Sequence, residues 1–588
     1  MKGENPMDKH QVLKHYFGHE HFRVGQEQLI DALHQGRDVL GVMPTGAGKS
    51  MCYQIPALMA QGVTIVISPL ISLMKDQVAA LKSAGVPAAY LNSSLTPEQI
   101  ELATERACQG MYRLIYVAPE RLETASFRGL TRRVKIALVA VDEAHCVSQW
   151  GQDFRPDYLN IASFIASLPE RPPVGAFTAT ATERVRQDII RLLELQSPVQ
   201  ATTGFDRPNL YFEVIQPKSR IDTLKKILRG KRDQFGIVYC ATRKTVMEVT
   251  EKLQDAGFSA AAYHAGLDDE TRRQSQEDFQ FDRVNVMVAT NAFGMGIDKS
   301  NVQYVIHYNM PKSMEAYYQE AGRAGRDGEN AECILLYSGQ DIFTAKWMIE
   351  HGEPNEALTP AERDQVRKQD YKRLNAMIDY CQTPDCKRAF ILRYFGEKGA
   401  DACGDCSSCC GARYEQEAQA ARSPSVKRTS LITNPVREVP KPETLTPSQE
   451  EVFARLRECR ILLAKQHHVP PYIICDDKTL RSMVSLMPRT KKELLQVHGM
   501  GEVKVSKYGQ AFLAAIEGGY VKQSAPGKVV VSKPRPAPSA AGRPWTAEED
   551  QRLRDMYLSG ERVADLAVAF GRTTGVIRSR LKEKGLIL

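Results

Sequence analysis

Residues 43–50, MPTGAGKS, combine the residue types and the spacing of a phosphate-binding loop. They follow a short apolar run at 38–42 and precede a helix-permissive segment beginning at Ser50, so a strand would turn into a helix here. Glycine lets the backbone wrap with its N–H groups turned inward, and the helix N-terminus adds positive charge facing the phosphate. Lys49 would reach the β- and γ-phosphates, and the Ser50 hydroxyl would complete a Mg²⁺ shell. We predict that a nucleotide is bound by Thr45, Gly46, Gly48, Lys49 and Ser50. A glycine-rich turn with an incidental lysine is the alternative, and Met43 departs from the strict G-x-x-x-x-G-K-S pattern.

Two carboxylates follow a second apolar run. Residues 136–141 read as a buried strand that ends in Asp142-Glu143-Ala144-His145, at the edge where open α/β sheets bind ligands. Asp142 can hold Mg²⁺ while Glu143 orients or activates the attacking water. A solvated acidic pair is the alternative, which the preceding phosphate loop disfavours.

The segment after these carboxylates, residues 146–156, is rich in aromatic and basic groups. Trp150, Phe154 and Arg155 lie there in a loop punctuated by Gly and Pro, next to the expected water activator. Aromatic faces stack on unpaired bases and Arg binds phosphate, so the loop is predicted to contact single-stranded nucleic acid. Core packing of Trp150 is the alternative. Upstream, the Gln26 amide can read an adenine edge, and we place it with Arg23 at the nucleotide.

Two successive series of strands and helices predict two parallel sheets. The predicted strands are 38–42, 63–68, 114–117, 136–141 and 174–177 in the first, and 236–240, 260–263, 284–289, 302–308 and 333–337 in the second. Two such cores with one phosphate loop suggest a cleft that clamps a nucleotide. Arg323 and Arg326, three residues apart and hence expected on one helical face, would reach the γ-phosphate as an arginine finger does, with Gln319 nearby.

The composition fits a globular protein of several domains. The 588 residues are 43% apolar and 25% charged, with a formal charge of +8 that leans weakly toward a polyanionic partner. We see no secretion signal or membrane span, and we expect a cytoplasmic protein, associated with the nucleoid if prokaryotic.

Thirteen cysteines are present, and four of them fall within residues 403–410. This clustering indicates a metal site rather than disulfides. Cys403, Cys406 and Cys409 can face one tetrahedral zinc ion, with Cys386 on a neighbouring helix as the fourth ligand. Cys410 is the alternative to Cys409 as a ligand.

Several motifs occur in the order seen in RecQ DNA helicases, which this chain resembles over residues 8–410. They are FRVGQ (22–26), MPTGAGKS (43–50), PLISLMKDQ (69–77), DEAH (142–145) with its aromatic loop, YHAGL (263–267), AFGMGI (292–297) and QEAGRAGRDG (319–328). The resemblance implies two RecA-like domains of superfamily 2, with ATP, Mg²⁺ and Zn²⁺ as cofactors. It also implies ATP-driven 3′-to-5′ movement on single-stranded DNA and duplex unwinding. That superfamily relaxes the first loop glycine, which accounts for Met43. His19 and Gln152 depart from the family, which commonly has an adenine-stacking aromatic and a His at these positions.

The sequence as a whole divides into two large domains and several smaller modules. We expect the α/β domains at 8–205 and 206–345, a zinc module at 346–410, a linker at 411–445, a helical domain resembling HRDC at 446–519, a second linker at 520–544 and a Myb-like helix-turn-helix at 545–588. The first linker is too short for the winged helix of typical family members, which we put at about 80 residues. The Myb-like helix, 572–584, is predicted to contact duplex DNA through Arg578, Arg580 and Lys582. Protein contacts are its alternative use.

The favoured function is therefore a DNA-stimulated ATPase and helicase in replication-fork or recombination repair, with single-stranded and duplex DNA as partners. Single-strand-binding protein and repair factors are candidate protein partners, and the oligomeric state stays open. Three alternatives remain. One is a translocase or annealing factor with weak unwinding, another is a nucleotide-switched architectural DNA-binding protein, and the third is an RNA helicase of the DEAH type.

Overall fold

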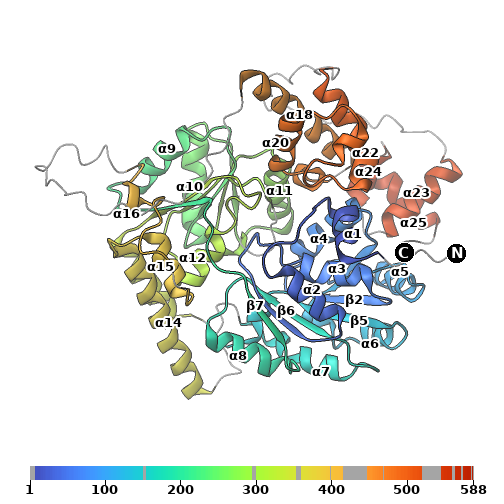
Figure 1. Ribbon diagram of the computed structural model, residues 1–588, viewed down its shortest axis with the longest axis horizontal. Coiled ribbons are helices and arrows are strands. Elements are labelled where there is room, and N and C mark those ends of the chain that lie inside the picture. The colour runs from blue at the N-terminus through green and yellow to red at the C-terminus, as the bar shows by residue number, and fades with distance from the viewer. Residues whose placement is uncertain are drawn as a thin grey trace, which may run out of the picture.

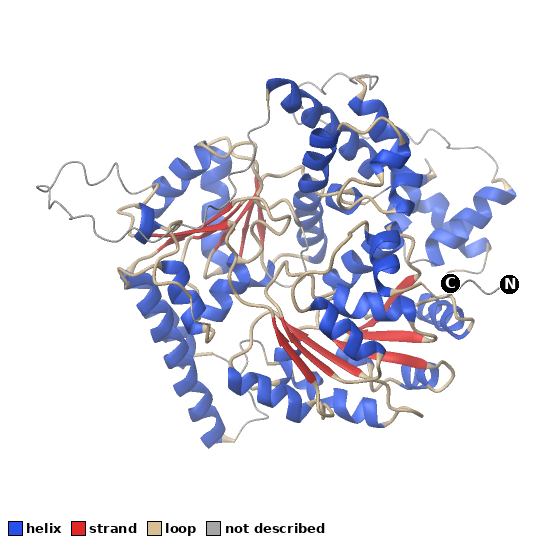
Figure 2. Ribbon diagram, in the orientation of Figure 1, coloured by secondary structure: helices blue, strands red, loops and turns tan. Residues whose placement is uncertain are grey.

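The computed structural model shows two α/β lobes, a cysteine module, a helical domain and a three-helix tail (Figures 1 and 2). It describes residues 7–149, 154–293, 299–352, 359–397, 399–414, 446–467, 469–518, 545–558, 563–570, 572, 574–584 and 586. Trp150, Gln152, part of the AFGMGI motif and nearly all of both predicted linkers lie outside these residues. Among the described helices, none has the length and apolar character needed to cross a membrane.

Lobe 1, residues 7–205, is built on a seven-stranded parallel sheet with the order β3-β4-β2-β5-β6-β1-β7. Its strands are β1 (Val39–Val42), β2 (Val63–Ile67), β3 (Ala88–Leu91), β4 (Leu114–Val117), β5 (Ile136–Val141), β6 (Val174–Thr178) and β7 (Val199–Thr202). The central strands are apolar and buried because helices cover both faces. Strands β5, β6 and β1 are neighbours, so the loops at their carboxyl ends lie side by side.

The helices of lobe 1 lie on both faces of this sheet (Figure 1). They are α1 (Lys9–Val12), α2 (Gln26–His34), α3 (Met51–Met59), α4 (Ile71–Ser83), α5 (Pro97–Cys108), α6 (Ala125–Thr131), α7 (Asn160–Ala166) and α8 (Glu183–Leu192), with short turns η1 (Leu13–Phe17), η2 (Pro119–Arg121), η3 (Ala144–Val147) and η4 (Pro156–Leu159).

Lobe 2, residues 206–352, has a six-stranded parallel sheet with the order β10-β11-β9-β12-β13-β8. Its elements are β8 (Leu210–Ile215), α9 (Arg220–Arg229), β9 (Gly236–Tyr239), α10 (Arg243–Asp255), β10 (Ala260–Tyr263), α11 (Asp269–Gln280), β11 (Val286–Ala289), η5 (Asn291–Phe293), β12 (Tyr304–His307), α12 (Met314–Ala321), β13 (Ala331–Leu336) and α13 (Gly339–Glu350).

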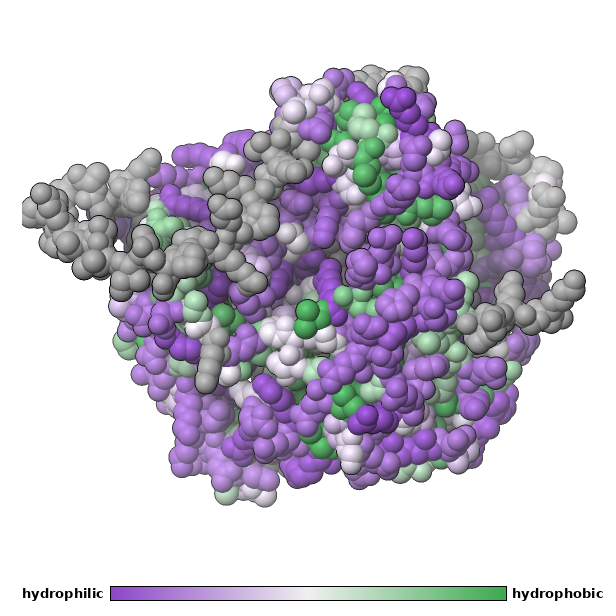
Figure 3. Space-filling view, in the orientation of Figure 1, coloured by the Kyte–Doolittle hydropathy of each residue, from purple (hydrophilic) through white to green (hydrophobic). Residues whose placement is uncertain are grey.

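Three helical parts follow. The cysteine module contains α14 (Pro360–Gln382), α15 (Lys387–Tyr394) and α16 (Ser407–Cys410). The helical domain contains α18 (Pro447–His467), α19 (Pro471–Ile474), α20 (Asp477–Leu486), α21 (Lys491–Leu494) and α22 (Glu502–Ile516), and the tail contains α23 (Ala547–Leu558), α24 (Val563–Ala569) and α25 (Thr574–Glu583). The face drawn in Figure 3 is mostly hydrophilic, with apolar side chains gathered over the helical domain.

The helical domain rests on both lobes (Figure 1). On lobe 1, Tyr508 Oη lies 3.2 Å from Ser83 Oγ, and Tyr472 Oη donates to Asp76 over 3.4 Å. On lobe 2, Arg481 pairs with Glu329 at 3.3 Å. The tail lies beside α5, where the Gln99 amide donates to the Tyr557 carbonyl over 2.9 Å.

The structure confirms the two parallel sheets and all ten predicted strands to within two residues at each end. Strands β3, β7 and β8 were not predicted, and all three are edge strands. Two helix predictions were wrong. Cys386, expected on a helix, lies between two of them: α14 ends at Gln382 and α15 begins at Lys387, so Cys386 is the cap of α15. Arg323 and Arg326 do not share a helical face, because α12 ends at Ala321 and turns containing Gly322 and Gly325 follow.

Candidate nucleotide cleft and zinc site

The phosphate loop connects β1 to α3, with Ser50 at the cap of the helix. Gly46 and Gly48 have φ of +84° and +81°, a region that side chains rarely adopt, so the wrapped backbone depends on glycine at both positions. The Lys49 ammonium donates back to the Met43 carbonyl over 3.2 Å. This backbone and ammonium geometry suits an anion held in the loop.

Gln26 braces this loop from α2. Its amide nitrogen donates to the carbonyls of Ala47 and Gly48 over 3.1 and 3.0 Å, and its oxygen accepts from the Arg23 N–H over 2.8 Å. The Arg23 guanidinium donates to the Gly46 carbonyl. Gln26 therefore supports the loop in this arrangement, and its contact with adenine stays a prediction.

The two carboxylates lie at the end of β5, as expected. Asp142 is 8% exposed, and burial raises the pKa of its carboxyl, as does the neighbouring Glu143 charge. Burial also acts to raise the pKa of Glu143, but the hydrogen bond and charge of His145 hold it below its usual value. The same His145 ring lies 2.9 Å from Thr178 Oγ1 at the end of β6, which links the carboxylate loop to the next strand.

A cavity of about 860 Å³ brings these groups together between the lobes. Its lining includes all of the predicted catalytic and nucleotide-binding residues: Arg23, Gln26, Thr45, Gly46, Gly48, Lys49, Ser50, Asp142, Glu143, Gln319, Arg323 and Arg326. Lobe 1 supplies the phosphate loop and the carboxylates, and lobe 2 supplies the arginines. Arg323 is 6% exposed and close enough to Glu143 to lower the pKa of that carboxyl.

The structure describes residues 146–149 and 154–156 of the aromatic loop. Arg155 donates to the Pro69 carbonyl over 3.1 Å, and its own N–H donates to the Cys146 carbonyl over 2.9 Å. The segment after the carboxylates is thus attached to the loop before α4. Contacts of Trp150, Phe154 and Arg155 with nucleic acid stay predictions.

The helical domain forms a further wall of the cavity, which the sequence reasoning missed. His498 lies with its ring 4.7 Å from the His19 ring, and the Gly499 N–H donates to the Gly18 carbonyl over 3.0 Å. Asp476 and Lys504 line the same space. The two glycines in residues 498–501 mark a turn in the sequence. Nothing in the sequence indicates that this turn contacts residues about 480 positions earlier.

The four cysteine sulfurs predicted as ligands all lie within 4.8 Å of one another. Cys406 Sγ is 3.8 Å from Cys386 Sγ and 3.5 Å from Cys409 Sγ, and Cys403 Sγ is 4.0 Å from Cys409 Sγ. Zn–S bonds of about 2.3 Å in a tetrahedron place sulfurs about 3.8 Å apart, so the cluster fits zinc. The Cys410 thiol instead points to the Cys406 carbonyl, 3.2 Å away, which leaves Cys409 as the fourth ligand.

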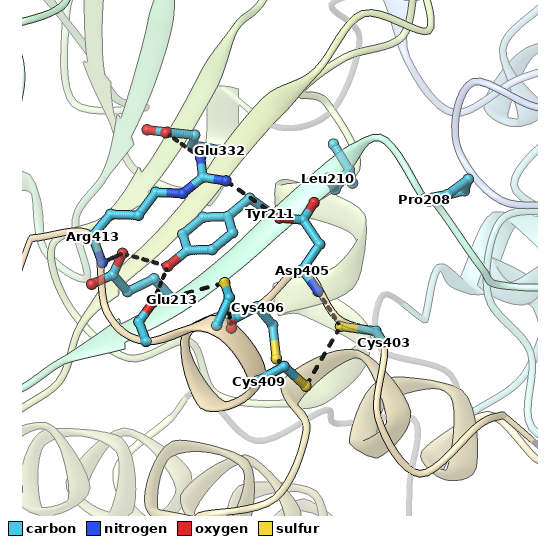
Figure 4. Close-up of polar contacts among 12 residues, drawn as sticks. Pro208, Leu210, Tyr211, Glu213, Glu332, Cys403, Asp405, Cys406, Cys409 and Arg413 are labelled. Atoms are coloured by element: carbon cyan, nitrogen blue, oxygen red, sulfur yellow. Dashed lines mark hydrogen bonds and ion pairs between the residues drawn. The ribbon is translucent and has the colours of Figure 1, made fainter. Parts of the chain in front are cut away.

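The zinc site is attached to the edge of lobe 2 (Figure 4). Arg413 lies over the Tyr211 ring, 3.6 Å from its centre, and pairs with Glu332 and Asp405 at 2.8 and 3.3 Å. Glu213 is fully buried on β8, where it accepts from the Tyr211 hydroxyl and from the Arg413 N–H. Burial raises the pKa of Glu213. The residues directly after α16 thus supply hydrogen bonds to a buried carboxylate on an edge strand.

The three residues of the tail that are predicted to contact DNA differ in their surroundings. Arg580 donates to both carboxylate oxygens of Asp550 over 2.7 Å and pairs with Glu583 at 2.6 Å. Arg578 and Lys582 are exposed on α25. Thr546 and Glu549 form a capping box at the start of α23, with hydrogen bonds of 3.3 and 3.1 Å.

Comparisons with known proteins agree with this architecture. Family models match for DEAD/DEAH box helicase at residues 23–189, helicase conserved C-terminal domain at 219–328, RecQ zinc-binding at 339–410 and HRDC domain at 449–516. The ATP-dependent DNA helicase RecQ of Bacillus subtilis is 40% identical over 586 residues, which covers 86% of this chain and 98% of that protein. The chain belongs to the RecQ family.

A second RecQ relative, the ATP-dependent DNA helicase RecQ of Haemophilus influenzae, is 36% identical over 600 residues, covering 86% of this chain and 95% of that protein. Among solved structures, Mycobacterium smegmatis helicase Lhr bound to ssDNA and AMP-PNP aligns with a TM-score of 0.45 and 18% identity, covering 60% of this chain and 55% of that one. Within the RecQ chain, the helical domain is the HRDC domain and the cysteine cluster is its zinc site.

Proposed function

We propose that this protein is an ATP-dependent DNA helicase that moves 3′ to 5′ on single-stranded DNA and unwinds duplexes in recombination and repair. The main support for this proposal is the cavity, which is lined by the phosphate loop of one lobe and by Arg323 and Arg326 of the other. Because the two walls belong to different lobes, binding and hydrolysis of ATP would close and open the cleft, and so move the lobes along a strand.

Each residue of the cavity has a proposed role. Lys49 and the glycine-rich backbone hold the phosphates, while Glu143 orients the attacking water. Arg323 and Arg326 stabilise the negative charge that spreads over the γ-phosphate in the transition state. Ser50 and Asp142, a hydroxyl and a buried carboxylate lining one space, are oxygen donors that suit Mg²⁺, which supplies further charge neutralisation when bound.

A strand-displacement assay tests the proposal. The wild-type protein is expected to unwind a 3′-tailed duplex with ATP and Mg²⁺, and to leave a 5′-tailed duplex intact. Lys49→Ala and Glu143→Gln should each lower ATP hydrolysis at least about 100-fold while single-stranded DNA binding survives, since both act in the chemical step. An active Lys49→Ala protein would remove the site assignment. Stronger ATPase stimulation by RNA than by DNA would favour the DEAH-type RNA helicase instead.

A second candidate is a translocase or annealing factor with weak unwinding. The B. subtilis alignment runs over 586 residues yet covers 86% of this chain, so that relative carries segments with no counterpart here. We propose that the winged helix is among them and that residues 411–445 are a linker. Unwinding that is slow relative to ATP turnover, compared with translocation measured by streptavidin displacement from single-stranded DNA, would identify this candidate.

We also propose that the Myb-like tail anchors duplex DNA in place of the winged helix. The exposed Arg578 and Lys582 on α25 support this proposal, whereas Arg580 is held by acidic neighbours. Deleting residues 540–588 should weaken duplex affinity and reduce its dependence on salt, because fewer phosphate contacts release fewer counterions. Unchanged affinity at several salt concentrations would refute the role.

A further inference from the structure

Arg207 lies in the chain segment that connects the two lobes, just before β8. Its guanidinium donates to the Thr45 carbonyl in the phosphate loop over 2.7 Å. It also donates to the carbonyls of Gly322, Ala324 and Gly325, over 3.3, 3.0 and 2.7 Å. One side chain therefore joins the phosphate loop of lobe 1 to the backbone that flanks Arg323 in lobe 2.

All of these acceptors are uncharged main-chain carbonyls, and a further donation reaches the Asn209 side-chain oxygen over 3.4 Å. Burial lowers the pKa of Arg207, and the charges of Arg326 and Arg23 lower it further. Arg207 is partly buried, and no carboxylate pairs with it among the described residues. A desolvated guanidinium in such a position is costly to hold unless its N–H groups are hydrogen-bonded. The bonds it makes depend on the lobes being close, since opening the cleft separates Thr45 from the lobe 2 carbonyls.

The two loops also touch directly at this point. A Cβ added at Gly322 would lie 3.4 Å from Thr45 Cβ, and one added at Gly46 would lie 3.5 Å from the Arg207 guanidinium. The phosphate loop and the arginine loop are thus close neighbours at the point where Arg207 bonds to both. Asn209 adds a second hold on lobe 2, donating to the carbonyls of Gly325 and Glu329 over 2.9 and 2.8 Å.

The zinc module fixes the segment that carries Arg207. Arg388, two residues after the zinc ligand Cys386, donates to the carbonyls of Arg207, Pro208 and Leu210, over 3.1, 3.4 and 2.7 Å. It also pairs with the Asp206 carboxylate at 3.2 Å. Arg388 therefore fixes the backbone of the linking segment, while the Arg207 side chain of the same segment bridges the cleft.

We propose that Arg207 is a positioning residue that sets the spacing between the phosphate loop and the arginine loop, with Arg388 as its anchor. The arginines then face the γ-phosphate only while this bridge is made. This inference rests on the proposed ATPase function. It assigns a role to a residue that is not among those lining the cavity. It also connects the zinc module to the phosphate loop through the contacts of Arg388 and Arg207.

The test compares Arg207→Gln with wild type and with a matched control, Arg171→Gln. The Arg171 guanidinium donates to the carbonyls of Pro172 and Glu194 and to the Asp38 carboxylate. All of these acceptors lie within lobe 1. Arg207→Gln should lower DNA-stimulated kcat about 100-fold, as expected for a small misplacement of catalytic groups, with ADP affinity within about 3-fold of wild type. Binding of ADP–aluminium fluoride should be lost, and hydrogen exchange in residues 43–50 and 319–328 should speed up with that analogue present.

Arg207→Lys keeps the positive charge but not the planar guanidinium that reaches several carbonyls at once, so its kcat should also fall. This variant replaces Arg207→Gln in the test if the Gln variant does not fold. Arg388→Gln should give a smaller fall in kcat. The proposal is overturned if Arg207→Gln and Arg207→Lys retain kcat within 3-fold of wild type, or if Arg171→Gln lowers kcat equally. A wild-type protein without ATPase activity would instead defeat the proposed function, while the exchange measurement would still report on the bridge.

Discussion

Replacing Cys409 with serine should release the zinc, whereas replacing its neighbour Cys410 should not. Cys409 Sγ lies 3.5 and 4.0 Å from two other cluster sulfurs, close to the spacing that a tetrahedral zinc site imposes. A serine hydroxyl is a harder and weaker zinc ligand than a thiolate. Because changes in the partners of ligands already cost 10–100-fold in metal affinity, we expect loss of a ligand to cost at least about 100-fold, or about 2.8 kcal/mol.

The Cys410 thiol makes only weak hydrogen bonds to the Cys406 and Gly411 carbonyls, which a serine hydroxyl can also make. Cys410→Ser should therefore keep one zinc per chain and stability within about 0.5 kcal/mol of wild type. The assay is zinc per chain, measured by elemental mass spectrometry after dialysis against increasing chelator. Equal chelator resistance of Cys409→Ser and wild type, or zinc loss in Cys410→Ser, would refute the assignment of the fourth ligand.

Three further predictions concern the nucleotide cleft. Gly48→Ala should weaken binding of a fluorescent ATP analogue about 10-fold, because the added Cβ would lie 2.6 Å from the Gln26 amide nitrogen at a φ of +81°, a strain of about 1–2 kcal/mol. His498→Ala should raise the KM for ATP several-fold with kcat unchanged, since it removes a ring from the cavity wall. Burial lowers the pKa of His19 to about 4, and the charges of His498 and Arg23 act in the same direction. The native state thus binds fewer protons than the unfolded state between pH 6.5 and 4, and urea unfolding should show this part of the stability falling as pH drops through that range.

The controls for these three differ. Gly110→Ala, at a glycine with φ of +73° and open space around it, should leave nucleotide binding intact. For His498, an unchanged KM would mean that the HRDC wall does not touch the nucleotide. For His19, a His19→Phe variant should lose this pH dependence, and equal acid sensitivity in the variant would assign it to other groups.

Much of the site could be predicted because its chemistry is local in sequence. A phosphate loop needs its glycines, lysine and serine within a few positions, and β4, β5 and β10 are short apolar runs that the structure reproduces at the predicted bounds. Edge strands were missed for a physical reason. An edge strand pairs on one side only, and β8 carries the polar Glu213. Its burial is offset by the N–H groups of Arg413 and Tyr414, some 200 positions away, and by the Tyr211 hydroxyl.

By itself, the sequence predicted a nucleotide site, and it determined the two parallel sheets and the zinc ligands up to the choice between Cys409 and Cys410. The tertiary structure decided that choice, and it placed His498 beside His19 and Arg207 across the cleft. These contacts join residues far apart in the chain through backbone carbonyls and ring faces. Carbonyls are common to every residue, so no local pattern of side-chain types can encode which of them a distant arginine will find.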